Sequence, residues 1–278
     1  MKHFLMTRFN LRNESWKTAK DGTLVLTEEW LNHRFSLFQQ YCLPSVKNQI
    51  NQNFIWLVFF DCATPDSFKI KIEEISKYYK PFHAIYIDGM NELLPSSRNY
   101  ISTFIDESDK FIITSRLDND DLIHQNFIGT IQQLARPSSD LIIDLRKGYQ
   151  INKGKKNPEI RKVYNYFNPF VSIVESTADF KTILSRMHRE WKHSTFVFSE
   201  DKKPLWIELI HEKNKLSIVR KNLLLTRNIR FREFGLIEVI KKPGLSFVVR
   251  TNTLILLKRF YAKCIKALQR FLFEGTSD

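Results

Sequence analysis

Cysteine, glycine and long apolar runs are all scarce in this chain of 278 residues. Its three cysteines, Cys42, Cys62 and Cys264, are odd in number and widely spaced, so the sequence predicts neither a disulfide framework nor a zinc site. Only 8 residues are glycine, and neither the P-loop motif nor G-x-G-x-x-G occurs, which argues against a P-loop NTPase and a Rossmann dehydrogenase. The sequence contains no run of about 18 apolar residues, so it predicts no transmembrane helix. Charged residues follow too soon after the N-terminus for a signal peptide. We therefore expect a cytoplasmic protein that holds any phosphate group with a metal and arginine side chains.

Basic charge is concentrated in the second half of the chain. The formal net charge is +13, but residues 1–140 carry 15 Lys/Arg against 17 Asp/Glu, whereas residues 141–278 carry 28 against 13. This asymmetry predicts an anionic partner for the second half, such as phospholipid headgroups, nucleic acid or an acidic polymer.

Apolar runs alternate with helical periodicity over the first 145 residues. This alternation predicts an α/β protein with a mostly parallel sheet flanked by helices. We expect strands at 4–9, 54–60, 82–88, 110–114 and 140–145, and helices at 26–41, 68–79, 96–105 and 125–134. Pro44 should interrupt the first helix, although Leu43 and Val46 could continue a short extra helix. Leu122 to Ile128 should form the first turns of the helix at 125–134. The later part predicts a basic hairpin and loop at 147–158, strands at 161–166, 170–175 and 205–211, and a helical segment within 179–193.

Residues 254–273 predict a cationic amphipathic helix. Apolar residues recur there at helical spacing, and between them stand Lys258, Arg259, Lys263, Lys266 and Arg270. Two interpretations are open. The helix either packs on the domain or lies in the plane of a membrane with its cations on anionic headgroups.

Three predicted strands end in aspartate, at Asp61, at Asp88 and at the cluster that opens with Asp118. Carboxylates so close together as Asp118, Asp120 and Asp121 repel one another unless a cation lies among them, and hard divalent metals take oxygen ligands. The alternative is an acidic turn that complements a helix dipole. Because ligands bind outside the carboxyl ends of strands in open α/β sheets, we prefer a ligand site.

Four motifs, in this order, resemble the putative rhamnosyltransferase family of bacterial glycosyltransferases with the GT-A fold. They are HFLMTRFN at 3–10, Asp61 followed by Thr64-Pro65, SRLDNDD at 115–121, and WIELIH at 206–211 followed by Asn214. The resemblance covers roughly residues 3–220 and leaves out the tail.

The resemblance implies a nucleotide-sugar site with a bound Mg²⁺ or Mn²⁺ ion. Asp118 would face the ribose or the metal, Asp120 would ligate the metal, and His211 would complete the metal site. Asp121 would support the loop or lie near the transferred sugar. Arginines pair well with diphosphate oxygens. The implied donor-binding residues are Thr7, Arg8, Asp61, Asp88, Arg98, Arg116 and Asp118.

Two carboxylates are candidates for the base that deprotonates the acceptor if the enzyme inverts. Glu208 comes first, because a carboxylate inside an apolar run takes up a proton more readily than an exposed one. Asp201 comes second, because Ser199-Glu200-Asp201 resembles the Glu-Asp pair of family-2 glycosyltransferases.

These features predict a metal-dependent glycosyltransferase that moves a sugar from a UDP- or dTDP-sugar to a saccharide or lipid-linked acceptor in surface polysaccharide or lipopolysaccharide synthesis. Its domain would span 1–240, with nucleotide binding at about 1–121 and acceptor binding at about 122–240, and 241–278 would be a basic tail. We expect it on the inner face of the membrane, held peripherally by the C-terminal helix. The alternative is a basic nucleic-acid-binding protein without catalysis, although no helix-turn-helix, RRM or zinc-finger signature occurs. A nucleotidyltransferase would need an N-terminal glycine-rich loop that is missing.

Overall fold

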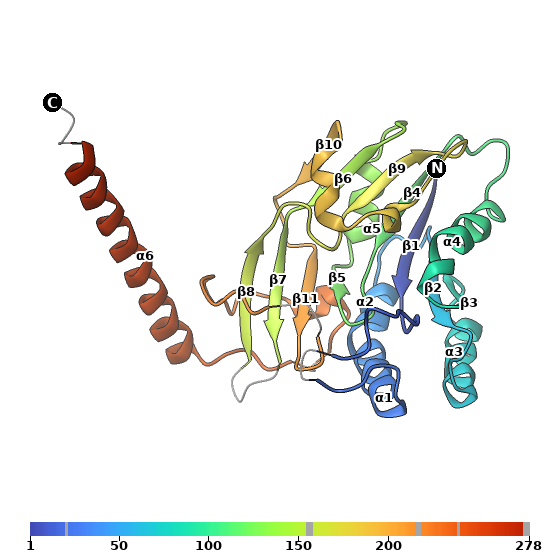
Figure 1. Cartoon of the computed structure of the whole chain (residues 1–278), viewed down its shortest axis with the longest axis horizontal. Coiled ribbons are helices and arrows are strands. Elements are labelled where there is room, and N and C mark those ends of the chain that lie inside the picture. The colour runs from blue at the N-terminus through green and yellow to red at the C-terminus, as the bar shows by residue number, and fades with distance from the viewer. Residues whose placement is uncertain (20–21, 154–157, 215–217, 238–239, 275–278) are drawn as a thin grey trace.

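A seven-stranded sheet forms the centre of the computed structural model, which describes residues 1–19, 22–153, 158–214, 218–237 and 240–274 (Figure 1). The strand order is β10-β6-β9-β4-β1-β2-β3. In this sheet β9 runs antiparallel to β4 and β6, and the other neighbouring pairs are parallel. The predicted α/β class with a mostly parallel sheet is therefore confirmed. The strands are β1 (Lys2–Arg8), β2 (Ile55–Asp61), β3 (Phe82–Ile87), β4 (Phe111–Arg116), β6 (Leu141–Leu145), β9 (Ser172–Ser176) and β10 (Phe196–Glu200).

The central strands are buried on both faces, because successive side chains of a strand point to opposite sides. Leu5, Trp56 and Phe60 pack in one core cluster, together with side chains of α1 (Glu28–Leu37) and α3 (Asp66–Tyr78). Phe4 and Leu57 pack in a second cluster with side chains of α4 (Leu93–Ser102). Two buried faces explain the unbroken apolar sequence of these strands. Each such side chain stabilises the fold by about 1.5–3 kcal/mol relative to exposure.

The helix predicted at 26–41 is longer and less regular than expected. α1 continues through a π-helical turn, η1 (Phe38–Cys42), directly into α2 (Leu43–Lys47). The chain does not leave the helix at Pro44, and the short extra helix expected from Leu43 and Val46 is present as α2. The wider π-helical turn before it lets the backbone N–H of Leu43 donate to the carbonyl of Phe38. Proline is also tolerated in the first turn of α2, where no N–H is needed.

A second, four-stranded sheet, in the order β5-β11-β7-β8, overturns one helical prediction. Leu122 and Ile123 do not begin a helix, because they form β5 and pair with Ile207 and Trp206 of β11. This tertiary pairing overrides the local pattern. The predicted hairpin is present as β7 and β8, although residues 154–157 of its basic loop lie outside the described residues. The bounds are β5 (Leu122–Ile123), β7 (Lys147–Asn152), β8 (Glu159–Tyr164), β11 (Trp206–Ile210) and α5 (Phe127–Leu134).

The helical segment expected within 179–193 is also different. The described chain forms two 3-10 helices there, η3 (Ile183–Ser185) and η4 (His188–His193), rather than an α-helix. η4 is anchored by Trp191, which is buried in the second core cluster. Two further 3-10 helices are η2 (Met90–Glu92) and η5 (Phe231–Phe234).

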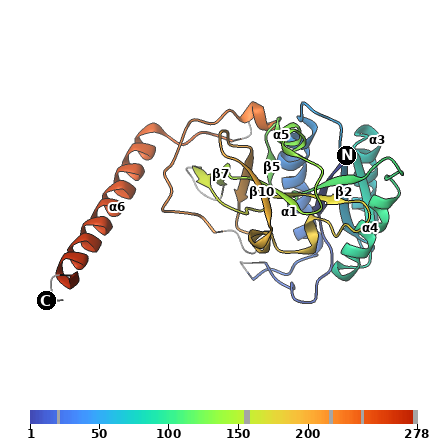
Figure 2. The same ribbon diagram turned by 90° about the horizontal axis from the view of Figure 1, so that it is seen from above.

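The C-terminal helix α6 (Leu245–Glu274) points away from the rest of the molecule in both views (Figures 1 and 2). Its first turns are attached by the buried Val248 and by Asn252, which exchanges hydrogen bonds of 2.8 and 3.0 Å with the backbone of Leu225. Farther along, apolar side chains such as Phe260 are exposed, so the helix does not pack along the domain. Within the described residues, no helix has the length and apolar character needed to cross a membrane.

Candidate active site

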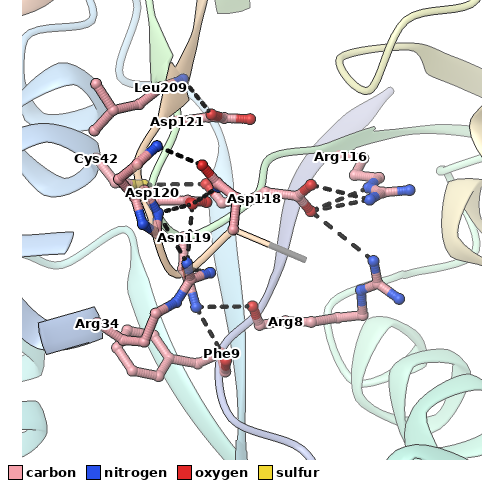
Figure 3. A network of polar contacts seen from close by, with 12 residues as sticks. Arg8, Phe9, Arg34, Cys42, Arg116, Asp118, Asn119, Asp120, Asp121 and Leu209 are labelled. Atoms are coloured by element: carbon pink, nitrogen blue, oxygen red, sulfur yellow. Dashed lines mark hydrogen bonds and ion pairs between the residues drawn. The ribbon is translucent and has the colours of Figure 1, made fainter. Parts of the chain in front are cut away.

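The loop after β4 is held against the carboxyl end of β1. The backbone N–H of Leu117 donates to the carbonyl of Met6 at 3.0 Å, and Asn119 Nδ2 donates to the carbonyl of Phe9 at 3.0 Å. A turn follows, in which the N–H of Asp121 donates to the carbonyl of Asp118 at 3.1 Å. This anchoring directs the three carboxylates of the loop to three different sets of partners (Figure 3).

Asp118 faces two arginines. Arg116 donates to its carboxylate through Nε and Nη2 at 3.0–3.2 Å, and Arg8 Nη2 lies 3.9 Å from Oδ1 (Figure 3). Two guanidinium groups on one carboxylate leave a net positive charge at this end of the sheet. Such a pair of cations suits a further anion, for which arginine geometry is well matched to phosphate.

Asp120 lies on the other side of the loop, in a buried network. Its Oδ2 accepts hydrogen bonds from Arg34 Nη1 at 2.9 Å and Asn214 Nδ2 at 3.1 Å, and His211 Nε2 lies 2.9 Å away. Burial by itself would raise the pKa of Asp120, but the charge of Arg34 and the hydrogen bond of His211 outweigh it and hold that pKa well below its usual range. Asp120 is therefore a carboxylate anion at neutral pH.

Asp121 connects the loop to β11. It is buried, and its Oδ1 accepts a hydrogen bond from the backbone N–H of Leu209 in β11 at 2.9 Å. Burial, followed by the nearby charges of Asp120 and Asp118, raises its pKa well above the usual range. Of the two predicted roles, these contacts favour support of the loop.

A cavity of about 210 Å³ lies beside this loop. One part of its lining is charged and includes Arg8, Arg34, Arg116 and the three aspartates, and the other part is apolar. The apolar part comes from the segment after β1, from α1 and from η2, with Leu11, Trp16, Ala19, Val25, Leu26, Trp30 and Met90. A charged end and an apolar end in one cavity suit a ligand such as a nucleotide that is itself divided in this way.

Asp61 and Asp88 meet at one cation. The cation is Arg12, whose Nε lies 3.0 Å from Asp61 Oδ1 and whose Nη2 hydrogen-bonds to Asp88. Asp61 is buried, whereas the Asp88 side chain is 74% exposed. The two acids thus flank the edge of the sheet next to the cavity and do not line it.

Two predicted donor-binding residues do not reach the cavity. Thr7 is fully buried inside the sheet core, where its hydroxyl accepts a hydrogen bond from Trp56 Nε1 at 2.9 Å. Arg98 lies on the exposed side of α4, with its guanidinium 5.9 Å from the ring centre of Phe180. Strand alternation and the position of α4 turn these side chains away.

The two candidate bases also lie away from the cavity lining. Glu208 is on β11, where it accepts a hydrogen bond from Gln150 Nε2 at 2.9 Å. Asp201 is exposed, and its Oδ2 is 3.4 Å from the hydroxyl of Tyr164. Neither carboxylate lines the cavity, although Glu208 directly precedes Leu209, whose N–H donates to Asp121 Oδ1.

Comparison with known proteins identifies the family. The sequence profile described as "Putative rhamnosyl transferase" matches residues 2–221. The chain belongs to this rhamnosyl transferase family. This confirms the family predicted from the four motifs, and it favours a glycosyltransferase over a nucleic-acid-binding protein without catalysis. No protein of curated function matches the sequence.

Solved structures with a similar arrangement include S. aureus TarS 1–349 in complex with UDP-GlcNAc. The match to that structure covers 80% of this chain and 63% of the TarS chain, with 12% identity and a TM-score of 0.44. The match to another structure of TarS 1–349 covers 75% of this chain and 60% of the TarS chain, with 12% identity and a TM-score of 0.43. The chain thus spans about three fifths of the length of these TarS structures. The inositol-1-phosphate CTP transferase from T. maritima matches 74% of this chain and 89% of its own, with 15% identity and a TM-score of 0.32.

The metal ligands expected for this rhamnosyl transferase family member do not gather as a set of three. Asp118 is engaged by Arg116, so it is separated from the pair formed by Asp120 and His211. Among the described residues, no three His, Cys, Asp or Glu side chains form a metal cluster. The remaining pair still suits Mg²⁺ or Mn²⁺, because such ions complete their coordination with water and substrate phosphates. His211 Nδ1 is buried without a hydrogen-bond partner among the described residues.

Sequence reasoning missed Arg34, which joins Asp120 to Asn119 (Figure 3). Its side chain is only 14% exposed although it sits on a helix, and its guanidinium lies 5.6 Å from the ring centre of Trp30. The signal was the spacing of Trp30 and Arg34 by four residues, which places both on one face of α1. Arg12 and Lys213 were also missed, and neither stands out in the sequence from other surface cations.

Proposed function

We propose that this rhamnosyl transferase family member transfers a sugar from a nucleotide sugar, with the diphosphate held beside the Asp118–Asp121 loop. The observation that carries the proposal is the convergence of Arg8, Arg34 and Arg116 on that loop, in a cavity with an apolar end. The arginines would neutralise the diphosphate, and their charge would favour the leaving nucleoside diphosphate over the intact donor. The apolar end, with Trp16, Trp30 and Met90, would take the base and ribose.

We further propose that Asp120 and His211 hold a divalent metal when the donor is bound. Mg²⁺ or Mn²⁺ would supply Lewis-acid stabilisation of charge on the diphosphate oxygens. The anionic state of Asp120 keeps a hard ligand ready, and the network of Arg34 and Asn214 fixes its orientation. Asp118 would not contact the donor directly, and it would instead hold Arg116 and Arg8 in place to bind the diphosphate.

The acceptor would be a saccharide or lipid-linked saccharide of surface polysaccharide synthesis, reached at the inner face of the membrane. The support for membrane binding is α6. This helix exposes apolar and basic side chains together, and the domain does not cover them.

A thermal-shift screen with UDP, dTDP, GDP and CDP, each with and without Mn²⁺, tests the proposal. One nucleoside diphosphate should raise the melting temperature by several degrees, and more strongly with Mn²⁺. A shift without Mn²⁺ dependence would remove the metal from the proposal, and the absence of any shift would contradict donor binding.

A further inference from the structure

His188, at the start of η4, is held in one tautomer by its backbone neighbour. Its Nδ1 hydrogen-bonds to the carbonyl oxygen of Phe167. A carbonyl oxygen can only accept, so in the neutral imidazole Nδ1 carries the hydrogen and Nε2 keeps its lone pair. No described residue hydrogen-bonds to Nε2, and the side chain is partly exposed. His188 thus presents a proton acceptor to solvent.

The group that fixes His188 is itself in an unusual conformation. Phe167 has φ +47°, a left-handed conformation that is rare for a bulky residue. Its N–H donates to both carboxylate oxygens of Asp144 at 3.2 Å, and Asn168 Nδ2 donates to Asp144 Oδ1 at 3.2 Å. Asp144 is fully buried at the end of β6. Local backbone strain of this kind persists only where the surroundings enforce it, and it concentrates at functional sites.

These residues lie at the same end of the sheet as the Asp118–Asp121 loop, since β9 begins where β4 ends. The segment that contains Phe167 leads into β9, and the N–H of Arg116 donates to the carbonyl of Val171 at 3.4 Å. The charges of Arg116 and Asp118 both act on the His188 imidazole. The segment from Phe167 to Val171, which holds His188, therefore contacts the end of β4 at Arg116.

We propose that His188 is the catalytic base that deprotonates the acceptor hydroxyl, in place of Glu208 or Asp201. This inference rests on the proposed function. Like Glu208 and Asp201, His188 does not line the donor cavity, so the acceptor would lie between His188 and the donor sugar. His188 is distinguished from the two carboxylates by its segment, which contacts the end of β4 through the hydrogen bond from the Arg116 N–H to the Val171 carbonyl.

The step is a single displacement with inversion. His188 Nε2 takes the hydroxyl proton while the acceptor oxygen bonds to the anomeric carbon of the donor sugar. The bond from that carbon to the diphosphate oxygen breaks, and its electron pair leaves with the nucleoside diphosphate. His188 then returns its proton to solvent.

Burial lowers the pKa of His188, the Phe167 carbonyl and Asp118 partly offset this, and Arg116 and Arg189 lower it further. The imidazole is accordingly neutral at pH 7 and able to accept a proton.

The test variant is His188→Asn, because an asparagine Nδ2 can keep the hydrogen bond to the Phe167 carbonyl while the base is removed. The nucleotide sugar whose diphosphate stabilises the wild-type chain is assayed for nucleoside diphosphate release with methyl glycosides as acceptor probes. We expect kcat to fall about 10²- to 10⁴-fold while the Kd of the nucleoside diphosphate stays unchanged. Free imidazole should partly restore turnover in His188→Ala.

The matched control is His193→Gln, which changes an exposed histidine of the same 3-10 helix and should leave kcat unchanged. Undiminished kcat in His188→Asn, or loss of turnover in Glu208→Gln or Asp201→Asn instead, would overturn the assignment. A fall in nucleotide affinity equal to the fall in kcat would assign His188 a structural role and overturn it as well. Failure of the wild-type chain to bind any nucleoside diphosphate would remove the proposed function itself, an outcome that the binding measurement separates from the others.

Discussion

Asp118 and Asp120 lie two residues apart and belong to different networks. Asp118 neutralises Arg116 and Arg8, whereas Asp120 pairs with His211 and Arg34. The same amide substitution should therefore have different effects at the two positions, since Asp120, unlike Asp118, contacts the His211 imidazole, with which it could share a metal.

We expect Asp120→Asn to abolish the Mn²⁺-dependent part of nucleotide binding and to lower turnover at least about 100-fold. Asp118→Asn should keep the Mn²⁺ dependence of nucleotide binding, because Asp120 and His211 remain. Isothermal titration with and without Mn²⁺ measures both effects, and Asp66→Asn, at an exposed position of α3, is the control. Equal loss of Mn²⁺ dependence in the two loop variants would contradict the separate networks.

His3 provides a prediction about stability and pH. It is buried in β1 with Nε2 2.7 Å from Ser115 Oγ, and burial lowers its pKa to about 3. Between about pH 6.5 and 3 the unfolded chain binds a proton that the folded chain does not, so stability is complete above this window and is lost as the pH falls. The slope from this one group is up to about 1.4 kcal/mol per pH unit.

Urea unfolding at pH 7, 5 and 4 should show this loss, and His3→Gln should reduce the slope while lowering stability at pH 7. An unchanged slope in the variant would show that His3 does not govern the acid response. A surface histidine change, His193→Gln, should leave the slope as it is.

At the residue scale, the acidic motif at 115–121 was predictable, whereas its long-range partners were not. Asp118, Asp120, Asp121 and His211 stand in motifs, so their part in one site could be predicted. Arg34 reaches Asp120 across 86 positions of the chain, and no local pattern encodes such a contact. The division of the aspartates between two networks also depends on where the loop is anchored to β1, which only the fold specifies.

At the scale of elements, the long buried strands were predictable and the short pairings were not. Continuous apolar runs such as 54–60 have one stable solution, a strand buried on both faces. β5 has only two residues, and its conformation is decided by pairing with β11. The same holds for the π turn before Pro44, where the proline constrained the geometry without ending the helix.

Alanine substitutions at two glycines, Gly148 and Gly129, should change the stability of the fold in opposite directions. In β7, a Cβ at Gly148 would lie 2.1 Å from the ring of Trp206, a fully buried residue stacked on Phe170. In α5, the nearest atom to a Cβ at Gly129 is 3.8 Å away, on Asn51. Gly148→Ala should therefore cost about 1–3 kcal/mol or more of overpacking, whereas Gly129→Ala should stabilise by up to about 1 kcal/mol through helix propensity.

Differential scanning calorimetry of the two variants checks these signs. Both changes add one methyl group, so the comparison isolates the surroundings. A stabilised Gly148→Ala protein would mean that the β7–β11 packing around Trp206 is looser than the structure shows.

At the scale of the whole molecule, charge and shape coincide. The basic excess of residues 141–278 includes the cations of α6, and this helix extends away from both sheets (Figure 2). The sequence predicted the helix from periodicity but could not choose between packing and membrane contact. In the structure, Leu257 is 57% exposed and Phe260 is 68% exposed, so the domain does not cover the apolar side.

Beyond Leu254, most of the apolar and basic side chains of α6 lie on different sides of the helix, with Lys258 at the edge of the apolar arc next to Ile265. At 3.6 residues per turn, Leu254, Leu257, Phe260, Tyr261, Ile265 and Leu268 fall on one arc, and Arg259, Lys263 and Lys266 fall on the opposite one. An in-plane membrane helix needs this division, with the apolar arc in the acyl boundary and the cations at the headgroups. We therefore expect binding to anionic phosphatidylglycerol vesicles and much weaker binding to neutral phosphatidylcholine vesicles.

Phe260→Glu should abolish vesicle sedimentation, while Gln269→Glu, which adds the same charge outside the apolar arc, should weaken it only slightly. The pair Lys263→Gln with Lys266→Gln should lower affinity for anionic vesicles about 10- to 30-fold, at about 1 kcal/mol for each cation. Equal effects of the two glutamate variants would indicate adsorption by charge alone. If the wild-type chain ignores anionic vesicles, the exposed apolar arc must be covered by a protein partner instead. Light scattering on the wild-type chain and Phe260→Glu then identifies that partner as a second copy if only the wild type forms a dimer.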